Sequence, residues 1–246
     1  MDEAAIRVSG YYVYSFGLLT AVAFLWGSFV FYKKAVESHF EDFHILDTVV
    51  MSAFWAFITG RVVFALLHWS EFWNHLSRVL MLTNYPGLDR WGAIGGVGLG
   101  VLFSIRRIKG RFWDWFDLAS LGILSGGAVF MAGLYLLTHT MEYLGLAVVY
   151  LLLFIFFWQV EDRYRTYEWY RGKRTSSRSG LISGFSLAFW GLSFVVEKWL
   201  FHNQDSWSLI WGLGLLVGGG VLVYIRSGRT ATEDIKNILK HGRKQN

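Results

Sequence analysis

The chain has 246 residues, of which 54% are hydrophobic and 19% aromatic, with one proline, no cysteine and a formal net charge of +5. This composition lies far outside that of an ordinary soluble domain and is typical of an integral membrane protein. Because cysteine is absent, the side chains of this chain can form no disulfide, no thiolate metal site and no cysteine nucleophile.

Seven apolar stretches are long enough, or nearly so, to cross a hydrocarbon core of about 30 Å, which takes about 20 residues. In chain order they predict membrane helices over residues 11–31, 45–67, 91–105, 115–137, 143–159, 180–201 and 206–225. The third is the weakest, because about 15 apolar residues could also form a buried or re-entrant segment. The first follows two acidic residues instead of a basic region, so we expect a permanent helix there. The expected fold is an all-α membrane protein with seven transmembrane helices.

The basic residues predict the orientation, because short cytoplasmic loops of membrane proteins are rich in Lys and Arg. If the seven helices alternate in direction, 18 of the 23 basic residues fall on one side of the membrane or in the C-terminal tail. The other five are Arg7, Arg61, Arg78, Arg90 and Lys198. We therefore expect the N-terminus outside and the C-terminus in the cytoplasm. The pI of about 9.4 then reflects topology and contact with anionic lipid, and we expect no nucleic-acid partner.

Residues 1–226 are predicted to form one transmembrane domain, followed by a cytoplasmic tail over residues 227–246. In the tail, TATEDIKNILK predicts a short amphipathic helix, with Thr230 and Glu233 at capping-box spacing. The outer connection, residues 70–89, has apolar residues near a helical period and is predicted to lie along the membrane interface. The inner connection, residues 161–180, mixes arginine with aromatic residues, as expected beside anionic headgroups.

The stretch RWGAIGGVGLG, which begins at Arg90, holds five glycines. Their spacing does not match the G-x-G-x-x-G pattern of a dinucleotide-binding loop. Gly92, Gly96 and Gly100 instead recur every four residues, a pattern that lets two membrane helices approach closely. The glycines therefore predict a packed helix face.

Charged side chains inside the hydrocarbon are costly and are candidate functional groups. Arg61 and Glu197 each lie sixteen residues along an outward-running helix, about 24 Å from its inner end at 1.5 Å per residue. At this common depth in the outer leaflet the two could pair and lower each other's desolvation cost. The pair could equally be structural, or Arg61 could extend to the outer interface. His68 and Lys198 lie further out along the same two helices and are expected at the interface.

Three aspartates, Asp47, Asp114 and Asp117, fall at the inner ends of predicted helices and are expected to be boundary residues. The sequence has no His/Glu metal spacing, no serine elbow and no paired carboxylates at catalytic spacing. We therefore expect no metal and no cofactor.

Four segments carry a likeness to a known family: YSFGLLTAVAFLWGSFVFYKKA, AFITGRVVFALLHW, YPGLDRWGAIGGVGLGVLFSIRRIKGRFWDWFDLAS and AFWGLSFVVEKW. Read in order, they resemble the bacterial prolipoprotein diacylglyceryl transferases, which are seven-helix enzymes of the inner membrane. The second segment retains Gly60 and Arg61 of a Gly-Arg helix. The fourth retains Phe194 and Glu197 of a late helix with the pattern Tyr-x-x-x-Arg-Phe-x-x-Glu.

The family transfers diacylglycerol from phosphatidylglycerol to the lipobox cysteine of a secreted precursor, so the nucleophile belongs to the substrate. The resemblance implies a multi-pass protein of the bacterial cytoplasmic membrane, with phosphatidylglycerol and a prelipoprotein signal segment as partners. It also implies that Arg61 and Glu197 are catalytic. The residues implied to contact lipid are Gly92, Gly95, Gly96, His68 and Lys198.

The chain departs from the family pattern at several positions. Ile94 stands where the family has a histidine before Gly-Gly, and Phe16 stands where its first helix has a tyrosine. Phe189 and Ser193 replace the late-helix tyrosine and arginine, and residues 120–137 contain no arginine or asparagine. Two interpretations stay open: a divergent diacylglyceryl transferase, or a catalytically inactive relative that binds lipid or lipobox segments or scaffolds envelope proteins.

Overall fold

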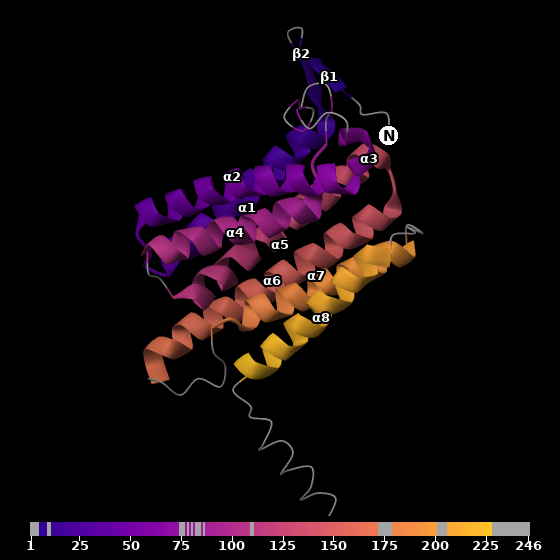
Figure 1. Ribbon diagram of the computed structural model, residues 1–246. Coiled ribbons are helices and arrows are strands. Elements are labelled where there is room, and N and C mark those ends of the chain that lie inside the picture. Colours follow the sequence, from indigo (N-terminus) through magenta and orange to yellow (C-terminus); the bar gives the residue numbers. More distant parts are fainter. Residues whose placement is uncertain are drawn as a thin grey trace, which may run out of the picture. The chain divides into compact units, whose positions relative to one another are not determined.

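The computed structural model describes residues 5–8, 11–73, 77, 79, 81, 85, 87–108, 111–171, 179–200 and 206–227. Seven long helices account for most of these residues (Figure 1). They are α1 (Ser15–Glu37), α2 (Asp42–Leu67), α4 (Arg90–Ile108), α5 (Phe112–Thr138), α6 (Met141–Arg171), α7 (Leu181–Leu200) and α8 (Ser206–Arg226). A single-turn helix, α3 (Trp69–Phe72), follows α2, and two short strands, β1 (Ala5–Val8) and β2 (Tyr11–Tyr14), precede α1. Most of the tail in which the sequence predicts an amphipathic helix lies outside the described residues.

Each of the seven predicted membrane stretches coincides with one of the seven long helices. Five contain spans long and apolar enough to cross a membrane, namely Gly17–Glu37, Asp42–Leu67, Phe112–Thr138, Met141–Asp162 and Leu209–Arg226. The apolar part of α7 is shorter, Leu181–Val196, and α4 is not among the five. A helical membrane protein is therefore confirmed, while the crossing by α4 and α7 and the orientation stay predictions.

The start of the first helix differs from the prediction. Helix α1 begins at Ser15, and residues 11–14, predicted to be helical, form strand β2. This strand pairs antiparallel with β1, so that Ala5 lies opposite Tyr14 and Val8 opposite Tyr11. The sequence YYVY is rich in aromatic and β-branched residues, which favour a strand once a partner strand is near. Hydropathy alone does not separate such a strand from the apolar helix that follows it.

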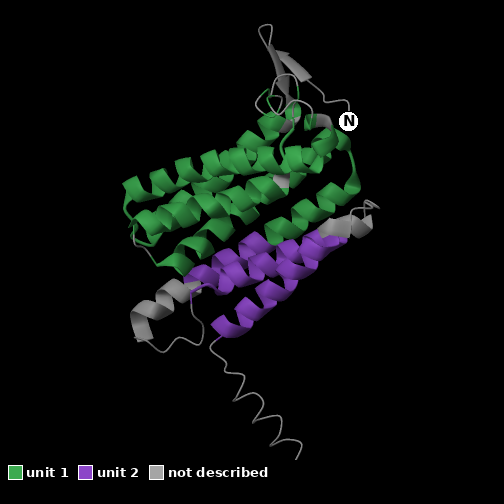
Figure 2. Cartoon of the chain, viewed as in Figure 1, with its two compact units in different colours: residues 1–152 green, residues 153–246 purple. Residues whose placement is uncertain are grey.

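Residues 1–152 form one compact unit, shown in green in Figure 2. Within it α1 packs against α5, α2 lies alongside α4, and α4 also contacts α5. The α1–α5 contact passes through two facing glycines. A Cβ added to Gly27 would lie 2.6 Å from Gly122 O, and one added to Gly122 would lie 2.8 Å from Gly27 O. The absence of side chains at these positions lets the two backbones meet.

The glycine row of α4 faces α2, as its spacing predicts. A Cβ on Gly92 would lie 2.8 Å from Val63 Cβ, and one on Gly96 would overlap Thr59 Oγ1 and the Trp55 carbonyl oxygen. A Cβ on Gly100 would overlap the backbone of Ser52. All three glycines are buried. The predicted close approach of this helix to a neighbour is therefore confirmed, with α2 as the neighbour.

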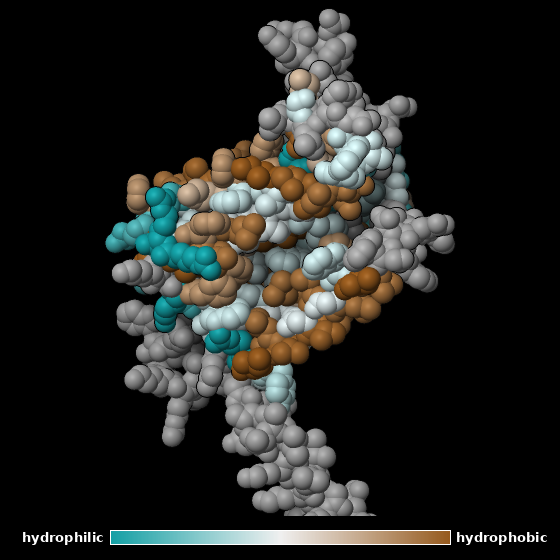
Figure 3. All heavy atoms as spheres, in the orientation of Figure 1, coloured by the Kyte–Doolittle hydropathy of each residue, from teal (hydrophilic) through white to brown (hydrophobic). Residues whose placement is uncertain are grey.

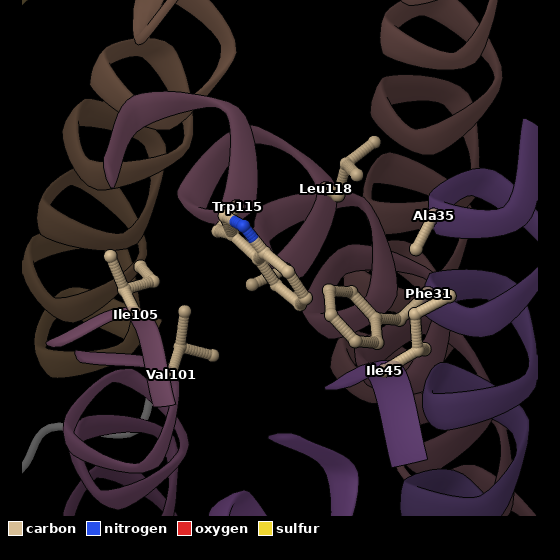
Figure 4. Close-up of a cluster of buried hydrophobic side chains, with 8 residues drawn as sticks. Phe31, Ala35, Ile45, Val101, Ile105, Trp115 and Leu118 are labelled. Carbon is tan, nitrogen blue, oxygen red and sulfur yellow. The ribbon is translucent and has the colours of Figure 1, made fainter. Parts of the chain in front are cut away.

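One end of this unit holds a cluster of buried apolar side chains contributed by four helices (Figure 4). Its members are Phe31, Ala35, Ile45, Val101, Ile105, Trp115, Leu118 and Ala119. Phe40 stacks on Trp115 with 4.5 Å between ring centroids. Lys34, one of the basic residues predicted to lie on the cytoplasmic side, is fully buried, and its Nζ lies 3.4 Å from Glu37 Oε2.

Ion pairs border this cluster. Arg107 Nη1 lies 3.7 Å from Asp47 Oδ2, and Arg111 Nε lies 2.7 Å from Asp114 Oδ2. Asp47 and Asp114 are thus near the helix ends, as predicted, and they pair with basic residues from the same end of the bundle. An acidic residue in the first turn of a helix, such as Asp114 in α5, also interacts favourably with the helix dipole.

Residues 153–246 form the second compact unit, shown in purple in Figure 2. Its helices α7 and α8 pack through glycines on both sides. A Cβ on Gly191 would lie 2.5 Å from Gly212 O, and one on Gly219 would lie 2.7 Å from Gly184 O. The part of α6 that belongs to this unit contacts α7 through Phe157, whose ring centroid lies 5.9 Å from that of Phe185.

Large apolar side chains are exposed along most of these helices, and the face in Figure 3 shows apolar residues over the helix surfaces. Leu25 is 67% exposed, Phe43 76% and Trp211 66%. In water such exposure would be costly, whereas lipid chains are the expected neighbours of these side chains in a membrane.

Two adjacent glycines give a matched test of the α2–α4 packing. We expect Gly96→Ala to destabilise the protein, because overpacking costs about 1–3 kcal/mol and exceeds the helix-propensity gain of about 0.5–1 kcal/mol. Gly95→Ala is the control, since a Cβ there meets nothing within 4 Å. Thermal unfolding in detergent should show a lower Tm for Gly96→Ala and an equal or higher Tm for Gly95→Ala. Equal Tm values for both variants would contradict the packing.

Candidate functional site

Arg61 is the charged residue that the structure buries within α2, with 4% of the residue exposed. Its Nε donates a hydrogen bond to the Val79 carbonyl oxygen at 2.7 Å, and its Nη1 donates to the Gly87 carbonyl oxygen at 2.8 Å. A buried guanidinium needs such acceptors, because a charge without hydrogen bonds is costly in an apolar interior. Arg61 thereby fastens two points of the connection between α3 and α4 onto α2.

Two aromatic rings complete the surroundings of the guanidinium. Arg61 Cζ lies 5.5 Å from the ring centroids of both Phe64 and Phe72, within cation–π range. Phe72 is fully buried. Gly87 has φ of +152°, and a Cβ there would overlap the Phe64 ring, so only glycine fits this turn without strain. We call these four residues, Arg61, Phe64, Phe72 and Gly87, the arginine cage.

Asp89 joins the arginine cage to the start of α4. Its Oδ1 accepts a hydrogen bond from Gly92 N at 2.7 Å, as an N-cap residue does, and its own N–H donates to Gly60 O at 3.0 Å. The Thr59 hydroxyl lies 2.7 Å from Gly92 O and equally close to Trp55 O. The turn of α2 that carries Arg61 therefore holds the first turn of α4. Sequence analysis did not identify Asp89, although an aspartate directly before a helical stretch is an N-cap signal.

The three glycines expected to contact lipid divide into two groups. Gly92 and Gly96 are buried against α2, where an added Cβ would already overlap the neighbouring helix. Gly95 lies on the exposed side of α4, with open space around its Cβ position. Of the three, Gly95 alone has a surface that a lipid can reach, and the other two set the distance between α2 and α4.

His68 lies beside the arginine cage, at the C-terminal end of α2. It is exposed, its ring stacks on Phe64 with 4.3 Å between centroids, and its Nδ1 lies 3.1 Å from the Phe64 carbonyl oxygen. The side chains of Glu197 and Lys198 lie outside the described residues. Their predicted roles, and the pairing of Glu197 with Arg61, therefore stay predictions.

The arginine cage favours a structural role for Arg61 over direct contact with a ligand. Turning the guanidinium toward a ligand would break its bonds to two backbone carbonyls. Ile94, at the position where the resemblance implies histidine, cannot exchange a proton. Among the described residues no group of three or more His, Asp or Glu side chains could hold a metal ion. Of the predicted lipid contacts among the described residues, Gly95 and His68 are exposed.

Comparison with known proteins shows the family to which this chain belongs. The sequence profile described as prolipoprotein diacylglyceryl transferase matches residues 3–136, more than half of the chain. The chain belongs to this family. The matched region contains the arginine cage, the α2–α4 pair and nearly all of α5, and it ends before α6.

Individual members of the family are more distant. A protein named phosphatidylglycerol–prolipoprotein diacylglyceryl transferase from Bacillus cereus strain B4264 is 25% identical over 129 residues, which cover 52% of this chain and 47% of the relative. A protein of the same name from Bacillus anthracis strain A0248 is 23% identical over the same proportions. The chain therefore spans about half the length of the curated relatives it matches.

The role of Arg61 as a clamp is testable by removing its donors. We expect Arg61→Leu to leave the part-buried carbonyls of Val79 and Gly87 without these donors, at a cost of at most about 1–3 kcal/mol for each. Unfolding in detergent should show this loss, and hydrogen–deuterium exchange should rise in a peptide covering residues 87–93. Arg107→Leu is the control, because it removes an exposed arginine from a surface ion pair. Equal destabilisation by both variants would contradict the clamp.

The N-cap of α4 gives a second test. Asp89→Ala removes the acceptor for Gly92 N and should cost about 0.5–2 kcal/mol of stability. Asp89→Asn retains a side-chain oxygen at the same place and should lose less. The two variants can be ranked by their unfolding midpoints, and an Asp89→Asn protein as unstable as Asp89→Ala would argue against capping.

Proposed function

We propose that this chain is a phospholipid-binding member of the family that does not transfer the diacylglyceryl group. The expected lipid is phosphatidylglycerol, because the curated relatives are named for it. The proposed location is the bacterial cytoplasmic membrane, with the N-terminus outside and the arginine cage in the outer leaflet. The gathering of Arg107 and Arg111 at the opposite end of the first unit supports this orientation.

The single observation that carries the proposal is the engagement of the Arg61 guanidinium. Transfer of a diacylglyceryl group to a thiol requires deprotonation of the thiol and stabilisation of the departing phosphate. Arg61 is 4% exposed and holds backbone carbonyls, so it is poorly placed to contact a phosphate directly. The presence of Gly60 and Arg61 is then explained by their contacts with the connection that leads into α4.

Two departures from the family pattern also argue against diacylglyceryl transfer. Ile94 cannot accept a proton from a thiol. Ser193 stands where the resemblance implies arginine, is buried, and donates its hydroxyl to the Phe189 carbonyl oxygen at 3.0 Å. A serine hydroxyl in an intrahelical bond provides no positive charge for a phosphate leaving group.

Diacylglyceryl transfer is the second candidate function, and membership of the family favours it. In that case Arg61 and Glu197 would act on phosphatidylglycerol, and the signal segment of a prelipoprotein would supply the thiol. The arginine cage and the α2–α4 contact are compatible with both functions. A direct assay of transfer therefore distinguishes the two candidates.

The proposed function predicts lipid binding without transfer. The full chain would be expressed in bacteria depleted of their own diacylglyceryl transferase and supplied with radiolabelled lipid. We expect no labelled lipoprotein above the empty-vector level and no rescue of growth. Labelled lipoprotein, with a mass increase of one diacylglyceryl group on its lipobox cysteine, would overturn the proposal in favour of the second candidate.

Lipid binding would be measured on the same protein by native mass spectrometry after gentle detergent extraction. We expect phosphatidylglycerol to copurify, and His68→Ala and Lys198→Ala, made separately, to lower its occupancy several-fold by removing polar groups near the predicted outer interface. Arg107→Ala is the control, since it removes a cation from the other end of α4. Occupancy no higher than in an unrelated membrane protein of similar charge would contradict binding.

A further inference from the structure

His68 follows the last turn of α2, and the structure fixes which of its ring nitrogens carries hydrogen. The ring stacks on Phe64 of the arginine cage, with 4.3 Å between centroids and 29° between the ring planes. Its Nδ1 lies 3.1 Å from the Phe64 carbonyl oxygen, which also accepts the backbone N–H of His68 at 3.0 Å. Because a carbonyl oxygen can only accept, Nδ1 carries a hydrogen in the neutral ring as well as in the protonated one. The nitrogen that gains or loses a proton is therefore Nε2.

The two forms of this ring make opposite contacts with an anion. In the neutral ring Nε2 can only accept a hydrogen bond, and the oxygens of a phosphate diester also only accept, so the two do not bind. In the protonated ring Nε2–H donates and the ring is positively charged, which permits a charge-assisted hydrogen bond to a phosphate oxygen. His68 is exposed and its Nδ1 is bonded to Phe64, so Nε2 is the nitrogen that a ligand can reach.

Other charged or titratable residues lie at this end of α2. Arg61 keeps its charge at any ordinary pH, but its Nε and Nη1 are bonded to backbone carbonyls. Asp89 caps α4, and the Tyr85 ring lies 6.1 Å from that of Phe72. Of these side-chain types, the imidazole is the one that titrates between about pH 5 and 8 in model peptides. The same stretch of sequence also has Glu71, His75, Arg78 and Arg90, whose side chains lie outside the described residues.

We propose that protonation of His68 controls the binding of an anionic phospholipid headgroup at the C-terminal end of α2. This inference rests on the proposed function, because it concerns the regulation of the same lipid site. The Nε2–H of the protonated ring donates to an oxygen of the phosphate diester, whose own charge does not change over the range in which an imidazole titrates. Binding is therefore strongest at low pH, is lost as the pH rises through this range, and is accompanied by proton uptake. With the predicted orientation, the ring responds to the pH outside the cytoplasmic membrane.

The binding test uses the full chain in nanodiscs of phosphatidylcholine, with radiolabelled dioctanoyl phosphatidylglycerol as the probe. Wild-type protein should bind the probe about 5-fold more tightly at a pH of about 5.5 than at a pH of about 8. His68→Ala should bind weakly at both pH values. His68→Arg keeps a permanent cation and should bind tightly at both.

Another exposed histidine provides the matched control. His139 follows α5 as His68 follows α2, and it also comes four residues after an aromatic residue, Tyr135, whose ring centroid lies 6.4 Å away. His139→Ala should keep the wild-type difference between the two pH values, and so should His75→Ala. Unfolding midpoints at both pH values establish that every variant is folded.

The hydrogen on Nδ1 has a test that does not depend on lipid. Nitrogen NMR of the full chain, isotopically labelled at histidine, distinguishes the two neutral tautomers, and the signal missing from His68→Ala identifies His68. At a pH of about 8 this signal should be that of the Nδ1–H tautomer. An Nε2–H tautomer would overturn the proposal, because the neutral ring could then donate to a phosphate.

The binding results separate this inference from the proposed function. Absence of saturable binding at both pH values would overturn the proposed function and the protonation switch together. Saturable binding with equal affinity at the two pH values would overturn the switch alone. A pH dependence that persists in His68→Ala, or that disappears in His139→Ala or His75→Ala, would likewise contradict the assignment to His68.

Discussion

The close approach of α4 to α2 is the constraint on which the first unit depends. Gly92, Gly96 and Gly100 bring the backbone of α4 onto α2, so that even one methyl group at Gly96 would overlap Thr59 and Trp55. This contact fixes where α4 begins, and the connection that leads into α4 must return to α2 at the same level. The arginine cage therefore depends on the packing of α4 against α2 through small residues.

The arginine cage follows from this geometry. The returning connection brings the carbonyls of Val79 and Gly87 to Arg61, and it brings Asp89 to the Gly60 carbonyl. The charge is stabilised by backbone dipoles and aromatic rings, in contrast to the opposite end of the unit, where arginines pair with aspartates. A guanidinium bonded to two backbone carbonyls holds the connection between α3 and α4 against α2. These bonds support the proposal that Arg61 does not contact a phosphate in this chain.

The second unit uses the two sides of α7 for different purposes. One side is glycine-rich and packs on α8, as α4 packs on α2. Another is a buried row of three serines and Trp190, which has no counterpart in a simple packed helix pair. Within this row Ser193 donates to the Phe189 carbonyl oxygen, while Ser186 Oγ and Trp190 Nε1 have no hydrogen-bond partner among the described residues.

The sequence by itself determined the number of long helices, their approximate limits and the packed glycine face, because hydropathy and residue spacing are local properties. Asp47 and Asp114 were likewise predictable at helix ends. Even so, local patterns did not separate the strand at residues 11–14 from the helix after it, since pairing with residues 5–8 decides that outcome. They also do not show that Lys34 is fully buried, because the burial of a side chain depends on the neighbouring helices.

Only the tertiary structure decided which protein atoms Arg61 binds. From the sequence it was an arginine at the depth of Glu197, free to be catalytic, paired or interfacial. Its acceptors lie 18 and 26 residues further along the chain, and they are backbone atoms, which carry no mark in the residue pattern. The unpaired groups of Ser186 and Trp190 were hidden for the same reason: whether a hydroxyl or an indole N–H has a partner depends on three-dimensional neighbours, and residue spacing shows only which side of a helix they share.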